Sequence, residues 1–377
     1  MTFDGSAHDD GHRAVSTVEA QRVDLDRVRH RVDAVLHGFI DRKRSEAGRK
    51  GLPDDVPAAL ADFLAAGGKR LRPLLCVLGW QAAGGTGERA LARAVQVGAS
   101  LEMFHAFCLV HDDVMDNSDT RRGQPTVHRA LAARYAADRG RELADAVGTS
   151  AAILAGDLAL LWSDELLHDP EHGLRPEEFS RLRPWVGLMR EEVMYGQCLD
   201  LIATGRPTPD TGPALAVIRY KTAKYTCERP LQIGAVLAGA DGALLRQLSA
   251  FALPLGEAFQ LRDDLLGAFG DPGETGKPDL DDLREGKHTV LVSLALRSAT
   301  AAQLRLLHGL YGKPGLTEED AATVRAVLRD TGADRAVERL ITDRYEHALT
   351  ALEALAAPGG VRHRLRVLAD KAVWRSS

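Results

Sequence analysis

The chain has 377 residues, 48 Lys and Arg against 53 Asp and Glu, and a net charge of −5. This mildly acidic balance argues against bulk nucleic-acid binding, and four widely spaced cysteines without a CxxC pair argue against a disulfide framework and against a zinc site. The polar N-terminus lacks the apolar core of a signal peptide and no run of about 18 apolar residues is free of charge, so we expect a cytoplasmic protein without a membrane span.

Residues 1–18 are rich in Asp, Gly, His and Ser, which predicts a disordered tail before one folded domain over 19–377. From there, Ala-, Leu- and Val-rich stretches of helical period alternate with Gly/Pro breaks, and strand-like runs of β-branched and aromatic residues are missing. This pattern predicts an all-α protein of about ten helices. Four long, largely apolar segments are expected in the middle of a bundle: 89–116, 142–168, 177–203 and 243–269.

The first charged motif along the chain runs from Gly67 to Pro73 and reads Gly-Gly-Lys-Arg-Leu-Arg-Pro. Its three cations stand on a glycine-rich backbone where a helix is expected to begin, which is a favourable place for an anion. Taken alone, the motif is better explained as a solvated loop.

Two aspartate clusters lie far apart in segments predicted as helix: Asp112-Asp113-Val114-Met115-Asp116 and Asp263-Asp264. At i and i+4, Asp112 and Asp116 share one helix face, where two carboxylates repel each other unless positive charge compensates. A solvated helix end is one explanation, but the apolar stretch before the first cluster favours a core helix that opens into a cavity. Mg²⁺ is commonly held by one or two carboxylates together with substrate phosphates, so the clusters predict Mg²⁺ bound against a diphosphate.

Further cationic sites accompany the aspartates. The pair Arg121-Arg122 precedes Gly123, and adjacent arginines can each hold a different phosphate through two hydrogen bonds. The Lys221-Thr222-Ala223-Lys224 segment adds a third basic site, and Lys277 with Lys287 a fourth. Four basic and two acidic sites in a nearly neutral chain suggest two polyphosphate groups, one bound to metal and one held by side chains.

In this order the motifs resemble those of the trans-isoprenyl diphosphate synthases, whose pattern also includes Phe259 to Arg262 before the second aspartate cluster and Thr275-Gly276-Lys277 after it. The resemblance covers the chain from near residue 20 to its end. It implies a single-domain helical bundle of the isoprenoid synthase type around a deep central cavity, usually as a homodimer. The implied substrates are isopentenyl diphosphate and an allylic diphosphate (dimethylallyl, geranyl or farnesyl).

The resemblance also implies a role for each matching residue. Two Mg²⁺ would be held by Asp112 and Asp116, and a third by Asp263 with support from Asp264. The allylic diphosphate would be bound by Arg121, Lys221, Thr222, Gln260, Lys277 and Lys287. Isopentenyl diphosphate would be bound by Lys69, Arg70, Arg72, His105 and Arg122. The residues implied in catalysis are Asp112, Asp116, Arg121, Lys221 and Asp263.

The implied reaction needs no protein nucleophile. Breaking the allylic C–O bond leaves a carbocation and a diphosphate, and Mg²⁺, Arg and Lys stabilise the anion best where water is excluded. The alkene of isopentenyl diphosphate then attacks the held cation, which is an advantage of positioning, and loss of a proton gives a chain five carbons longer. The released diphosphate is a plausible base.

Two positions depart from the family pattern. Gly267 stands where many relatives carry a third aspartate in the second cluster, which suggests weaker Mg²⁺ affinity with activity retained. Leu280 stands where relatives often have a glycine, which places the closing loop and Lys287 in question.

Product length is expected to depend on how far the cavity extends below the first cluster. In the family, the positions four and five residues before the first Asp commonly set its floor, and here these are Cys108 and Phe107. One ring beside one thiol, with Phe104 nearby, favours a geranylgeranyl (C20) product, with farnesyl or C25 diphosphate as alternatives. A helical wheel alone selects Cys108 and Leu101, and core packing is the alternative explanation for both phenylalanines.

Two other functions compete. A terpene cyclase also ionises an allylic diphosphate, but it has no second substrate and no use for Lys69, Arg72 and His105. A non-catalytic subunit of a heteromeric synthase would usually lose the first aspartates or the arginine pair, and both are intact here.

Overall fold

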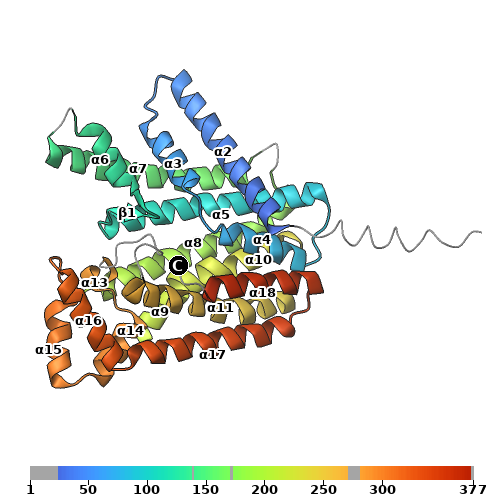
Figure 1. Cartoon of the computed structure of the whole chain (residues 1–377). Coiled ribbons are helices and arrows are strands. Elements are labelled where there is room, and N and C mark those ends of the chain that lie inside the picture. The colour runs from blue at the N-terminus through green and yellow to red at the C-terminus, as the bar shows by residue number, and fades with distance from the viewer. Residues whose placement is uncertain (1–23, 138–139, 170–172, 271–280, 375–377) are drawn as a thin grey trace, which may run out of the picture.

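A computed structural model of the chain describes residues 24–137, 140–169, 173–270 and 281–374 (Figure 1). The predicted tail at 1–18 and the residues Lys277 and Leu280 lie outside these ranges.

The described residues form a bundle of helices joined by short loops, and the all-α prediction is confirmed. The first half of the chain forms helices α2 (Leu25–Arg49), α3 (Asp55–Ala65), α4 (Leu71–Ala82), α5 (Glu88–Met115), α6 (Val127–Tyr135), α7 (Arg141–Leu167) and α8 (Pro176–Ala203). The second half forms α9 (Gly212–Val217), the π-helix η1 (Ile218–Glu228), α10 (Arg229–Leu237), α11 (Gly242–Phe269), α13 (Asp281–Glu285), α14 (Val290–Ser298), α15 (Ala301–Leu310), α16 (Glu318–Asp330), α17 (Ala333–Glu353) and α18 (Gly359–Val373).

The four long segments expected in the middle of the bundle correspond to α5, α7, α8 and α11, with ends that differ by at most one residue from the prediction. Helix α5 packs on α4 and α7, and α11 packs on α17 and η1. The side chains of α5 from Ala94 to Phe104 are all buried, which explains why this segment is apolar around its whole circumference. The C-terminal end of α5 continues into β1, and β1 and α13 lie at the same end of the bundle, so both aspartate clusters reach that end (Figure 1).

The π-helix η1 is held tightly between two long helices. A side chain at Gly196 of α8 would lie 2.3 Å from the backbone nitrogen of Lys221, and one at Gly256 of α11 would lie 2.5 Å from the Cα atom of Ala223. Only glycine permits such close approach at these two positions. π-Helices are rare in proteins, but those that occur are often found at functional sites. Here η1 carries Lys221 and Thr222.

A short antiparallel ribbon follows α5 and was not expected from the sequence. Strand β1 (Thr120–Arg121) pairs with β2 (Gln124–Pro125), with Arg121 opposite Gln124. The two turn residues have positive φ angles, 55° at Arg122 and 72° at Gly123, as a tight hairpin turn requires. The ribbon fixes both arginines of the pair beside the first aspartate cluster.

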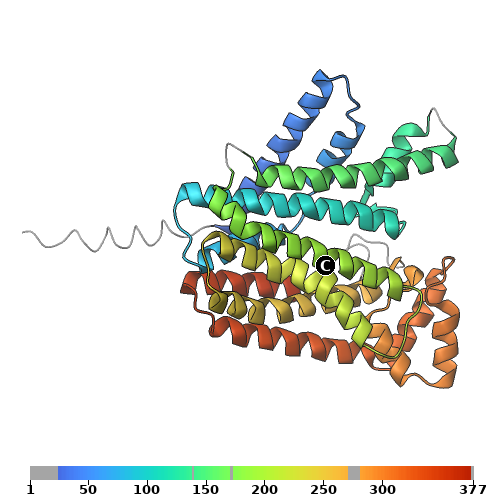
Figure 2. The ribbon, with the colours of Figure 1, turned by 180° about the vertical axis from the view of Figure 1, so that it is seen from behind.

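One face of the bundle keeps large apolar side chains exposed. Helix α7 is long and apolar enough to cross a membrane, although core helices of soluble proteins meet the same criteria. Only 39% of its most apolar 18-residue stretch is buried within the chain. On α7 and α8, which lie on the near side in Figure 2, the exposed large apolar residues are Leu143, Ile153, Leu154, Leu161, Leu188, Met194, Tyr195, Leu199, Leu201 and Ile202.

Candidate active site

A polar cavity of about 530 Å³ lies between the C-terminal ends of α5 and α11, the start of α4, η1 and the β1–β2 ribbon. Most of the side chains expected at a site line this one cavity. They are Lys69, Arg70, Arg72, His105, Asp112, Asp116, Arg121, Arg122, Lys221, Thr222, Gln260, Asp263 and Lys287.

The first aspartate cluster faces the cavity from the last turn of α5. Burial disfavours the charged form of Asp112, but the positive charges of Lys221, Lys287 and Arg121 outweigh it and lower its pKa to about 2. At Asp116, burial and the neighbouring Asp112 raise the pKa although Lys287 lowers it. The surrounding cations therefore stabilise the charged form of Asp112, whereas burial and repulsion outweigh them at Asp116.

Asp113, between these two residues, is buried and does not line the cavity. Both of its oxygens accept from Arg121 Nε, at 2.8 and 2.9 Å, and Arg121 Nη2 lies 2.6 Å from Asp113 Oδ1. Arg121 Nη2 also lies 3.5 Å from Asp112 Oδ2. Asp113 thus orients the guanidinium toward Asp112.

Lys221 joins η1 to α5 and α8. Its ammonium donates to Asp112 Oδ1 at 3.1 Å and to Asp200 Oδ2 at 2.6 Å. Burial lowers the pKa of Lys221, but Asp112 and Asp200 raise it more, so the ammonium stays charged. The Gln197 amide donates to the same Asp112 oxygen at 3.0 Å.

The second aspartate cluster is reached through a chain of hydrogen bonds. The Thr222 hydroxyl donates to Gln260 Oε1 at 2.7 Å, and Gln260 Nε2 donates to Asp264 Oδ1 at 2.8 Å. Burial, with the nearby charges of Asp263 and Asp282, raises the pKa of Asp264 to about 7. Asp263 lines the cavity, whereas Asp264 does not line it and is hydrogen-bonded to Gln260, which does.

Gly267 leaves room for a carboxylate from another segment. A Cβ atom at Gly267 would lie 1.9 Å from Asp282 Oδ2, so no larger side chain fits while Asp282 occupies this place. The sequence suggested that a ligand is lost at this position, and the structure shows that the Asp282 carboxylate occupies the space.

Lys287 lies in the cavity despite the doubt raised by its loop. Its ammonium is 3.3 Å from Asp116 Oδ2, 3.5 Å from Asp282 Oδ1 and 2.9 Å from Glu285 Oε2. Burial lowers the pKa of Lys287, but these carboxylates raise it well above its usual value.

The part of the cavity wall that contains Arg72 and Arg122 is cationic. Arg72 donates to the Thr226 hydroxyl at 2.7 Å and its guanidinium lies 4.2 Å from the ring centre of Tyr225. Arg122 donates to the carbonyl of Gly67, and a side chain at Gly68 would lie 3.1 Å from this guanidinium. The missing side chain at Gly68 therefore allows Arg122 to lie against the backbone that precedes α4.

Arg70 differs from its neighbours. Only 4% of it is exposed, and it donates to Asp33 at 2.8 Å, to Glu102 at 2.9 Å and to the carbonyl of Leu64 at 2.7 Å. Its charge and three of its five N–H groups are engaged within the chain, so its expected contribution to binding isopentenyl diphosphate stays a prediction. Arg70 also anchors the start of α4, where its φ of 46° is left-handed.

His105 lies where the polar cavity meets a second, apolar one. Burial and the positive charges of Arg72 and Arg122 lower its pKa well below the usual value, so its imidazole is neutral. The Nδ1 atom lies 3.3 Å from the hydroxyl of Tyr225.

The apolar cavity has a volume of about 410 Å³ and runs between α5 and α8. It shares Arg72, His105 and Asp112 with the polar cavity, so the two adjoin each other. Of the predicted chain-length residues, Phe107 and Cys108 line it, whereas Phe104 is fully buried with its ring 5.2 Å from that of Phe107. Leu101, selected by the helical wheel, is buried outside the lining.

The residues of the polar cavity fit Mg²⁺. Their donors are carboxylate oxygens, which a hard cation prefers, and the acidity of Asp112 provides a charged ligand at neutral pH. Within the described ranges, no three His, Cys, Asp or Glu residues form a complete metal cage. This arrangement suits a cation that is held partly by one or two carboxylates and partly by a phosphate.

Several contacts were missed by reasoning from the sequence: Asp113 behind Arg121, Asp200 and Gln197 beside Lys221, and Asp282 at Gly267. One signal was available, since Gln197 and Asp200 are polar residues three apart in a largely apolar helix segment.

The fold and the cavity define a class of enzyme: a helical bundle in which carboxylates and cations surround a diphosphate site that adjoins an apolar cavity. The chain matches the polyprenyl synthetase family over residues 54–329 and belongs to it. It is therefore a trans-prenyltransferase, which condenses isopentenyl diphosphate with allylic diphosphates.

Relatives in this family make products of different length. The geranylgeranyl pyrophosphate synthase of Corynebacterium glutamicum, solved with isoprenyl diphosphate and magnesium, is 40% identical, with a TM-score of 0.88 and 93% of this chain and 99% of that chain covered. The geranylfarnesyl diphosphate synthase of Aeropyrum pernix is 33% identical over 86% of this chain and 95% of its own length. The geranylgeranyl diphosphate synthase of Saccharolobus solfataricus is 35% identical over 70% and 73%.

Proposed function

We propose that this prenyltransferase makes geranylgeranyl diphosphate, with twenty carbons. The observation that carries the proposal is that Phe107 and Cys108, one bulky ring and one small thiol, both line the apolar cavity below Asp112. Phe107 is supported from both sides, because its ring centre lies 5.2 Å from Phe104 and 4.8 Å from His111. A supported ring limits chain growth better than a mobile one.

The polar cavity is suited to ionise the allylic substrate. We assign two Mg²⁺ to Asp112 and Asp116 and a third to Asp263, with Asp264 in support; bound Mg²⁺ supplies charge that stabilises the departing diphosphate. Arg121 and Lys221 add two cations whose positions are fixed by Asp113 and Asp200. Lys277 is assigned to the same group from the motif alone.

The cationic wall is suited to hold isopentenyl diphosphate. Lys69, Arg72 and Arg122 line it beside neutral His105. The Tyr225 ring and the Thr226 hydroxyl hold the Arg72 guanidinium in one orientation, so the bound alkene is positioned before the allylic bond breaks. After the alkene attacks, a proton leaves the new chain, and the released diphosphate is the nearest base that this arrangement offers.

A C25 product is the second candidate. The thiol of Cys108, which lines the apolar cavity, is small, and the similarity to the geranylfarnesyl synthase of Aeropyrum pernix extends over most of both chains. A C15 product has less support, because only one of the two positions before the first Asp carries a ring.

We also propose that two copies of the chain associate through α7 and α8. These helices carry most of the exposed large apolar side chains, including Leu161 at 63% and Ile202 at 67% exposure. A face of this kind on a monomer marks an interaction site. Met194 and Leu201 belong to this face and also line the apolar cavity, so a second copy would cover the cavity from outside. Light scattering of the chain and of Leu161→Asp tests this, since a monomeric wild type would contradict it.

The direct test is incubation of the purified protein with Mg²⁺, labelled isopentenyl diphosphate and each of dimethylallyl, geranyl and farnesyl diphosphate. A C20 alcohol after dephosphorylation supports the proposal, and a C25 alcohol supports the second candidate. Asp112→Ala is the matched control and should abolish incorporation. Label that stays unincorporated with all three primers, in a folded protein, would favour a non-catalytic subunit.

A further inference from the structure

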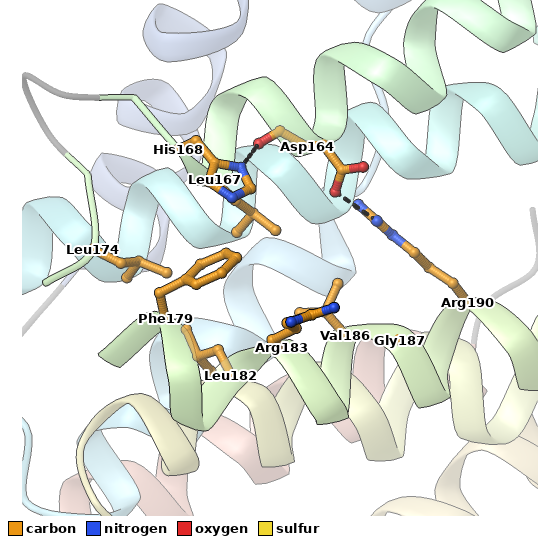
Figure 3. A pocket seen from close by; sticks show the side chains of 10 residues that line it. All are labelled: Asp164, Leu167, His168, Leu174, Phe179, Leu182, Arg183, Val186, Gly187 and Arg190. Carbon is orange, nitrogen blue, oxygen red and sulfur yellow. Dashed lines mark hydrogen bonds and ion pairs between the residues drawn. The ribbon is translucent and has the colours of Figure 1, made fainter. Parts of the chain in front are cut away.

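A third cavity lies along α8, on the N-terminal side of the residues that line the apolar cavity. It has a volume of about 520 Å³ and lies between the end of α7 and the first half of α8 (Figure 3). The α8 residues that line the apolar cavity run from Val193 to Leu201, and those that line this lower cavity run from Phe179 to Arg190. Residues 190 and 193 are about 4.5 Å apart along a helix axis, so only a thin partition separates the two cavities.

Arg190 and Phe104 connect the linings of the two cavities. The Arg190 guanidinium, which lines the lower cavity, lies 5.2 Å from the ring centre of Phe104, and Phe104 in turn contacts Phe107, which lines the apolar cavity. Arg190 donates to Asp164 Oδ1 at 2.6 Å and to the Ser163 hydroxyl at 2.9 Å. Figure 3 shows the Arg190 side chain extending from α8 toward Asp164 at one edge of the lower cavity. Its Nε atom is buried and has no hydrogen-bond partner among the described residues.

We infer that the charged guanidinium of Arg190 sets the upper limit on the length of the product. A chain that passed Phe107 and displaced Phe104 would press hydrocarbon against a cation that already has one unsatisfied donor. Covering this guanidinium, whose side chain is 17% exposed, with hydrocarbon is unfavourable, because the charge loses its remaining hydration and gains no new partner. Phe107 is thus the first barrier and Arg190 the second, and the lower cavity stays closed to the chain.

The inference rests on the proposed prenyl transfer and makes a separate claim about length. Four proteins test it: the wild type, Phe107→Ala, Arg190→Met and the double variant, each incubated with labelled isopentenyl diphosphate and farnesyl diphosphate. Methionine keeps most of the volume of arginine and removes its charge. We expect Phe107→Ala to lengthen the main product, and the double variant to exceed Phe107→Ala by at least one isoprene unit.

The matched control is Asp164→Asn in the Phe107→Ala background. It removes the same ion pair and leaves the guanidinium over Phe104, so its products should match those of Phe107→Ala. If the double variant gives the same longest product as Phe107→Ala, the inference is wrong. If Asp164→Asn lengthens the product as much as Arg190→Met, loosened packing is responsible and the inference is again wrong. Absence of elongation by the wild type would instead contradict the proposed function.

Discussion

Replacing Asp113 by Asn should damage the site although Asp113 lines no cavity. The change keeps the size of the side chain and removes the charge that faces Arg121 through contacts of 2.6 to 2.9 Å. Breaking a buried ion pair by neutralising one partner costs about 3–5 kcal/mol. We expect a smaller cost here, about 2–3 kcal/mol, because the Arg121 side chain is 20% exposed and Asn keeps one hydrogen-bond acceptor. If that loss falls on the orientation of Arg121, kcat/KM for the allylic substrate should drop about 100-fold.

The assay is a double-mutant cycle of Asp113→Asn and Arg121→Gln, read in kcat/KM for the allylic diphosphate and in the free energy of unfolding by urea. Because Asp113 acts through Arg121, the double variant should be little worse than Arg121→Gln alone. Asp119→Asn is the control: its carboxylate is on the same segment, pairs with Arg129 at 2.7 Å and has no contact with Arg121. Fully additive losses in the cycle would refute the positioning role.

Three further changes have defined outcomes. Phe107→Ala should lengthen the product by at least one isoprene unit, whereas an unchanged product, separated by chromatography, would mean that the ring only packs the core. Gly267→Ala should displace Asp282, whose oxygen lies 1.9 Å from the added carbon, and raise the Mg²⁺ concentration for half-maximal turnover about tenfold; an unchanged Mg²⁺ titration would contradict this. His105→Asn tests the pH dependence of stability. The pKa of His105 is lower in the folded than in the unfolded protein. As the pH falls below about 6.5, the free energy of unfolding of the wild type, measured with urea, should therefore decrease by up to about 1.4 kcal/mol per pH unit more than that of the variant. Parallel curves would show that His105 is not held neutral.

The bundle could be predicted because its central helices are long and strongly periodic. Segments 89–116 and 243–269 were placed to within a residue, since an apolar run of this length has few alternatives to a core helix. Shorter features were missed. The β1–β2 ribbon depends on a turn of four residues, and the π-helix η1 depends on the close approach of α8 and α11 at Gly196 and Gly256, which is a tertiary effect.

The cavity could be predicted in part for a similar reason. Spacing within one helix places Asp112 and Asp116 on one face, and the order of the motifs indicates which cations belong with them. Pairing between helices does not follow from spacing. The sequence therefore grouped Arg70 with the other cations of its motif, whereas the fold directs its guanidinium to Asp33 and Glu102.

The pairing of charges explains how so many ionised groups can share one cavity. Lys221 contacts Asp112 and Asp200, and Lys287 contacts Asp116, so the carboxylates of the first aspartate cluster that line the cavity are paired with cations within the chain. Bound Mg²⁺ would bring positive charge into the cavity and a bound diphosphate negative charge. Binding would then replace the ion pairs within the chain by ion pairs to the ligands and leave few charges unpaired. Removing one member changes this balance: without Lys221, the pKa of Asp112 would rise from about 2, because one of the cations that offset its burial would be lost. Loss of Lys221 should therefore weaken diphosphate binding but not Mg²⁺ binding, because the ammonium no longer competes with the metal for Asp112 Oδ1.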